Sequence, residues 1–318
     1  MTLENKIINL KQSAILDHEI IVKLSNFEDF YKTFGRFEHF FISKSFLEKI
    51  LYLKNQVIEN PNSFILNSST LRFVLETLIH SKLFLMEEKY IYTFFFFFYS
   101  EQIKKCENFI SRLEYEIQLI DKYKIEEENT KPDKTNLSNN SEEDIQKYFN
   151  KIKKIEREID ARAEKELTIF WGDFKNMGYF LQKSLMEEQL LQKYESQLQH
   201  LQHLKNKKQE ELFKKENLKV LFNFTNEDDV FNKLKETRRT WKTKAEVTSL
   251  EKEYELVYEI TSASLHSTSY SIITNSETNE QEQIFALELI CKYSKEITEN
   301  LLQFLEFDRY SKIEVVNI

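Results

Sequence analysis

The sequence predicts an all-α protein in which a helical bundle carries an inserted antiparallel coiled-coil arm. The chain has only 3 glycines and 2 prolines in 318 residues, and these are the residue types that break helices and form turns. Three stretches within residues 101–216 repeat apolar side chains at alternating spacings of three and four, which is the pattern of helices that pair. We therefore expect residues 1–100 and 217–318 to form the bundle and residues 101–216 to form the arm.

The first hundred residues have the short apolar periods of several amphipathic helices. Ser25-x-x-Glu28 and Ser45-x-x-Glu48 match the capping-box pattern, in which a hydroxyl and a carboxylate bond the free amides of a helix start. Asn60–Ser63 includes a proline and predicts a turn.

The most apolar stretch, Tyr90–Tyr99, includes five consecutive phenylalanines. It has half of the roughly 20 apolar residues that cross a bilayer, so we expect a buried helix segment and no membrane span. The first ten residues mix charged and apolar side chains, which argues against a secretion signal. The 2 cysteines are far apart in the sequence, and a reducing, cytoplasmic location explains them most simply.

Residues 101–216 contain three apolar seams. Their members are Ile103, Cys106, Ile110, Leu113, Ile117 and Ile120, then Ile145, Tyr148, Ile152, Ile155 and Ile159, then Leu191, Tyr194, Leu198 and Leu201. Between the first two seams, residues 126–144 have Leu137 as their only large apolar side chain, a composition that predicts a mobile loop. Two seams joined by such a loop predict an antiparallel hairpin with the loop at its tip.

From residue 217 onward the pattern of a globular helical protein returns. Thr225-x-x-Asp228 and Thr278-x-x-Gln281 are expected to start helices. The last helix is expected to bury one stripe of apolar side chains, which consists of Leu287, Ile290, Ile297, Leu301 and Phe304.

Polar side chains capable of chemistry recur every four residues near the C-terminus, at Tyr254, Tyr258, Ser262 and His266. On a helix this spacing forms one slowly drifting stripe. His266 is the group in the stripe that exchanges a proton near neutral pH. The alternative is that the tyrosines pack in the core and His266 is a hydrogen-bonded structural residue.

Arg72 and Glu76 form an i,i+4 pair within an otherwise apolar segment. Unpaired charge is costly to bury, so this pair either faces water or is satisfied within the fold. One hypothesis is an ion pair that joins two helices. The other is a guanidinium directed at a phosphate or carboxylate.

Residues 233–244 hold six basic side chains and one acidic one around Trp241. The net charge of the whole chain is −8, which excludes a surface that is basic all over, but a local basic run beside an aromatic ring suits single-stranded nucleic acid. Arg238, Arg239 and Trp241 are therefore candidate substrate-binding residues. A solvated helix face with a buried tryptophan explains the same pattern.

The familiar phosphate, hydrolase and metal motifs do not occur in the sequence. Glu-x-x-His is also absent, so a ferritin-like metal site lacks its ligands. We expect neither a cofactor nor a bound metal. His200 and His203 lie outside the third seam and are expected at the surface.

Two blocks of the chain resemble a bacterial family known as a domain of unknown function. The blocks are Arg72-x-x-x-Glu76 and Trp241 followed by Tyr254-x-x-x-Tyr258-x-x-x-Ser262-x-x-x-His266, and together they cover about a third of the sequence. The resemblance implies an all-helical core in which the Arg72 helix meets the His266 helix, with the middle region inserted as an arm.

The architecture also looks like HEPN domains, helical bundles that often act as metal-independent ribonucleases in toxin and antiphage systems. The signature of that superfamily is an arginine and a histidine with four to six residues between them, whereas seven residues separate Arg72 from His80. The helical rise puts the Cα atoms of Arg72 and His80 ~12 Å apart. The resemblance therefore favours Arg72 acting with His266 across two helices, with Arg72 holding the phosphate and His266 moving the proton.

Two main classes of function remain open from the sequence, and a membrane-associated effector acting through Phe94–Phe98 is a third alternative. In the first, the protein is a bacterial defence or toxin-type effector whose polar pocket at Arg72, Glu76 and His266 acts on RNA or a nucleotide, with Tyr254, Tyr258 and Ser262 contacting the substrate. In the second, it is a non-catalytic module that recruits a protein partner or self-associates through residues 101–216.

Overall fold

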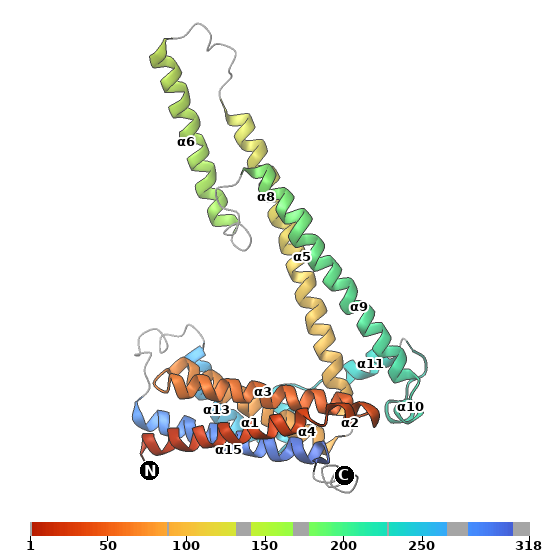
Figure 1. The fold of residues 1–318 in the computed structure, drawn as a ribbon. Coiled ribbons are helices and arrows are strands. Elements are labelled where there is room, and N and C mark those ends of the chain that lie inside the picture. The colour runs from red at the N-terminus through yellow and green to blue at the C-terminus, as the bar shows by residue number, and fades with distance from the viewer. Residues whose placement is uncertain are drawn as a thin grey trace. The chain divides into compact units, whose positions relative to one another are not determined.

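The computed structural model describes residues 2–87, 89–131, 141–167, 178–227, 229–265 and 279–307. These residues form helices, with no β-strand among them (Figure 1), so the predicted all-α class is confirmed. They divide into two compact units. No helix within the described ranges is long and apolar enough to cross a membrane.

The first unit comprises Met1–Thr93 and Glu236–Ile318, and the second comprises Phe94–Lys235. The insertion is therefore wider than the expected residues 101–216. One helix runs unbroken through the phenylalanine-rich stretch into the insertion. At the other end, the ring of Phe231 lies 4.9 Å from that of Phe96, centroid to centroid, which holds the segment before residue 236 in the second unit.

Seven helices of the first unit are α1 (Leu3–Ser25), α2 (Glu28–Thr33), α3 (Phe37–Glu59), α4 (Phe64–Met86), α12 (Trp241–Val247), α13 (Glu251–Leu265) and α15 (Glu280–Phe304). Helix α4 packs against α3, α12, α13 and α15. Its buried residues include Leu71, Val74, Leu75, Leu78 and Ile79. These residues cover more than one face of the helix, because neighbouring helices surround α4. The helix that carries Arg72 is thus the centre of this unit.

The starts of these helices agree only in part with the sequence. The turn at Asn60–Ser63 is confirmed, and the Ser63 hydroxyl accepts a hydrogen bond from the Leu66 amide, 3.3 Å away, to cap α4. Ser25 is instead the last residue of α1, and its hydroxyl donates to the Ile21 carbonyl. Ser45 lies inside α3. Both predicted capping boxes are wrong. The residue that precedes α2 is Phe27 and not Ser25, and the apolar period of α3 continues through Ser45.

The second unit contains α5 (Tyr90–Thr130, whose first turn belongs to the first unit), α6 (Glu142–Glu166), α8 (Tyr179–Leu185), the π-helix η2 (Met186–Leu191), α9 (Gln192–Phe213), α10 (Glu216–Phe222) and α11 (Asp229–Glu236). Ion pairs Glu126–Arg162 and Lys131–Glu156 join α5 to α6. The guanidinium of Arg112 donates to the carbonyl of Glu166. Residue numbers rise on α5 as they fall on α6, so the two helices are antiparallel.

A small apolar core lies between these helices of the second unit. Its buried members are Leu113, Ile117, Leu119, Ile120, Tyr123, Ile159, Ala163, Leu167 and Met186. The seams therefore supply much of the core, although coiling of the helices around one another stays a prediction. Helix α5 continues to Thr130 and α6 begins at Glu142, so the expected loop is shorter than residues 126–144. Residues 132–140 of that segment lie outside the described residues.

Candidate functional site

The candidate site lies where α4 and α13 pack against each other. Helix α13 buries Val257 and Thr261, which are four residues apart and therefore share one face. Tyr254, Tyr258 and Ser262 lie next to that face. Helix α4 carries Arg72 and Glu76 at the edge of the same contact, so these two side chains, Tyr254 and Tyr258 lie together at the α4–α13 boundary.

Arg72 is held by two neighbours. Its Nε donates to Oε1 of Glu76 over 3.0 Å, and its guanidinium carbon lies 4.8 Å from the centroid of the Tyr258 ring. The side chains of Arg72 and Glu76 are 27% and 23% exposed. The i,i+4 pair anticipated from the sequence is present, and stacking on Tyr258 joins it to α13.

Tyr254 and Tyr258 lie side by side, with ring centroids 5.6 Å apart. Burial raises the pKa of Tyr254, the Glu76 carboxylate raises it further, and the Arg72 guanidinium lowers it. These couplings place Tyr254 next to the ion pair. Ser262 is partly buried one turn further along. His266 follows the last residue of α13 and lies outside the described residues.

The basic run is distributed between the two units, since Lys233 and Lys235 belong to the second and Arg238 onward to the first. Arg239 pairs with Glu87, with 2.5 Å between Nη1 and Oε1. The Trp241 ring is partly buried. The Nζ atom of Lys244 lies 4.4 Å from the centroid of the Trp241 ring.

His80 belongs to an aromatic cluster that sequence reasoning missed. Its Nδ1 is 2.8 Å from the hydroxyl of Tyr90, and its ring meets the edge of Trp241 at a centroid distance of 5.1 Å. Burial lowers the pKa of His80 to about 3, and the positive charge of Lys244 contributes to the shift. The sequence gives little sign of this cluster, because Trp241 is far from His80 along the chain.

A buried ion pair was also missed. Nζ of Lys54 on α3 lies 2.5 Å from a carboxylate oxygen of Asp17 on α1 and donates to the Ser13 hydroxyl at 2.8 Å. The side chains of Lys54 and Asp17 are 0% and 5% exposed. Thr298 on α15 donates to the same carboxylate, so three helices of the first unit share one polar contact.

The chemistry available at the α4–α13 boundary is that of a partly exposed cation beside two tyrosine rings. A guanidinium binds phosphate or carboxylate oxygens well, and tyrosine rings offer faces for stacking. Among the described residues, no group of three or more His, Cys, Asp or Glu side chains is arranged to hold a metal ion.

Comparison with known proteins finds no family model, no curated protein and no solved structure that matches this chain.

Proposed function

We propose that the protein is a bacterial defence or toxin-type effector that acts on RNA or a nucleotide at the α4–α13 boundary. The observation that supports this most is the position of Arg72, a partly exposed cation held against Tyr258 by the pair with Glu76. Helix α13 carries Tyr258 and Ser262, and His266 is the next residue in the sequence after the helix ends at Leu265. In this proposal Arg72 supplies the phosphate-binding group, and His266 supplies the proton-transfer group.

Each residue has a distinct role in this proposal. Arg72 holds a phosphate oxygen through its Nη atoms, while Glu76 fixes the guanidinium through Nε. Tyr254 and Tyr258 contact the base or sugar by stacking, and Ser262 adds a hydroxyl. His266 moves a proton to or from the reacting oxygen. Metal-independent cleavage of RNA is the reaction that the resemblance of the sequence to HEPN domains implies.

Incubation of the full chain with total RNA in the presence of EDTA tests the proposal. Arg72→Ala and His266→Ala should each lower the cleavage rate roughly 100-fold, whereas Arg157→Ala should not, because Arg157 is an exposed residue on α6 of the second unit. Circular dichroism establishes that each variant is folded. Absence of cleavage by the wild type, or equal cleavage by all four proteins, overturns the catalytic proposal.

A second candidate is a non-catalytic interaction module that works through the inserted unit. Apolar side chains on its surface favour this function, since Tyr115 and Ile125 on α5 are 47% and 56% exposed and Phe149 on α6 is 51% exposed. If the protein is an interaction module, removal of the second unit abolishes its effect on cells, while Arg72→Ala and His266→Ala leave that effect unchanged. The opposite pattern supports the effector.

A further inference from the structure

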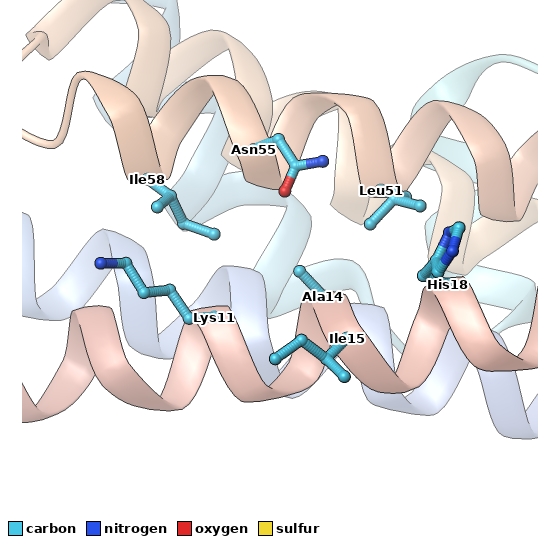
Figure 2. A pocket seen from close by; sticks show the side chains of 7 residues that line it. All are labelled: Lys11, Ala14, Ile15, His18, Leu51, Asn55 and Ile58. Carbon is cyan, nitrogen blue, oxygen red and sulfur yellow. The ribbon is translucent and has the colours of Figure 1, made fainter.

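An open groove lies between α1 and α3 in the first unit. It has a volume of about 400 Å³ and is lined by Lys11, Ala14, Ile15, His18, Leu51, Asn55 and Ile58. Figure 2 shows Lys11, Ala14, Ile15 and His18 on one helix and Leu51, Asn55 and Ile58 on the neighbouring one. Such a volume is within the usual range of ligand sites.

The lining combines an apolar floor with positive charge. Ala14, Leu51 and Ile58 are apolar, and Asn55 is neutral. Lys11 and His18 are the two ionisable residues among the lining residues, and neither is acidic. The lining residues therefore include no carboxylate. An apolar ligand with negative charges at its border complements this surface.

An apolar ridge runs along α1 beside the groove. Ile8, Ile15 and Val22 are seven residues apart and 45%, 59% and 50% exposed. Leu10 and Leu24, two residues after the first and last of them, are fully buried and lie on the opposite face, because two residues correspond to about 200° of helical rotation. Helix α1 therefore has an apolar face in the core and a second apolar face in water.

The dimensions indicate a helical ligand. From Ile8 to Val22 the ridge extends about 21 Å along the helix, and the exposure of Lys11, Ile15 and His18 means that the groove is shallow. A small molecule in it would remain largely in water, whereas a helix lying along α1 covers the ridge and the groove together. Heptad spacing is also the spacing at which two helices keep in contact.

We propose that the α1–α3 groove binds an amphipathic helix of a partner protein whose apolar face is bordered by acidic residues. The apolar side chains of the partner pack against Ile15, Leu51 and Ile58, and its carboxylates pair with Lys11 and accept a hydrogen bond from the ring of His18. This inference is independent of the activity proposed for Arg72.

Fluorescence anisotropy with two synthetic four-turn helical peptides tests the inference on the full chain. Both peptides carry leucines at heptad a and d positions, and one has glutamates and the other lysines at the flanking e and g positions. The glutamate peptide should bind about fivefold tighter, and Lys11→Glu should reverse that preference. Ile15→Ser should weaken binding about tenfold. Leu16→Ser is the matched control, because Leu16 is similarly exposed, at 58%, and is not among the residues that line the groove.

Three results would overturn the inference. The first is failure of both peptides to bind, and the second is equal binding of the two peptides. The third is a dimer of the wild type, seen by light scattering, that Ile15→Ser dissociates and Leu16→Ser does not, since the occupant is then a second copy of this chain. Circular dichroism of each variant excludes unfolding as the cause.

Discussion

The imidazole of His80 illustrates how packing sets the chemistry of a single residue. It contacts the hydroxyl of Tyr90 and the ring of Trp241, and Lys244 adds positive charge nearby. Loss of solvent disfavours the protonated form, so His80 is neutral in the folded protein at ordinary pH. Its role in the wild type is to join α4, α5 and α12 within the first unit.

The stability of the protein should therefore depend on pH through His80. The pKa is about 3 in the folded state and 6.5 when unfolded, so between these values the unfolded chain binds more protons and stability falls as pH falls. Between pH 8 and pH 5 the protonation of His80 in the unfolded chain lowers the free energy of unfolding by about 2 kcal/mol. Urea unfolding of the wild type and His80→Gln at both pH values measures it. If the free energies of unfolding of the two proteins change in parallel, His80 is not the source.

The Lys54–Asp17 pair should be strongly coupled. Lys54→Met leaves the buried Asp17 carboxylate without its cation, and we expect a destabilisation of about 3–5 kcal/mol. Asp17→Leu combined with Lys54→Met removes both charges and should recover most of that loss. A double-mutant cycle measured by urea unfolding gives the coupling free energy between the two residues. Additive effects of the two single substitutions would contradict a coupled pair.

The difference between these residues and Arg72 shows what spacing alone reveals. Arg72 and Glu76 are four residues apart on one helix, so their contact follows from helical geometry. Asp17 and Lys54 lie on different helices, and their pairing depends on how α1 packs against α3. Stacking of Arg72 on Tyr258 depends in the same way on α4 meeting α13.

At the scale of the helices, apolar periods were more informative than helix-start motifs. Positions such as Leu113, Ile120 and Ile159 of the predicted seams are buried, because the period of three and four is what selects a buried face. A cap requires a break in the helix, and a Ser-x-x-Glu pattern within a continuous period provides none. This is why Ser45 lies inside α3.

The last helix supplies a testable cap. Asn279 accepts from the Glu282 amide at 2.9 Å, and Glu282 accepts in return from the Asn279 amide at 3.1 Å. This pair is one residue later than the expected Thr278-x-x-Gln281, of which Thr278 lies outside the described residues. Asn279→Ala should lower stability by about 1 kcal/mol, whereas Asn279→Asp should retain it. Thermal unfolding distinguishes the two variants. Equal melting temperatures of the wild type and Asn279→Ala would show that the cap is not needed.

At the scale of the whole chain, the sequence predicted that one region interrupts another but misplaced the junctions. The change of composition near residue 100 marks the end of the phenylalanine run, whereas the structural junction is at Thr93, in the first turn of α5. A helix that passes between units without a break leaves no glycine or proline to mark the boundary. The contact of Phe96 with Phe231 joins segments far apart in the chain.

The geometry of the junction makes the inserted unit removable. Thr93 is the last residue before the insertion and Thr237 is the second residue after it, and their hydroxyls are hydrogen-bonded at 2.9 Å. A short Gly-Ser linker therefore spans the two ends with little loop entropy. We expect residues 1–93 joined in this way to residues 236–318 to fold, because α1, α3, α4, α13 and α15 pack among themselves. Circular dichroism should show a helical protein that unfolds in one cooperative transition. A helical signal without a transition would mean that the first unit needs the insertion for its packing, and the boundaries drawn at Thr93 and Glu236 would then not define an independent fold.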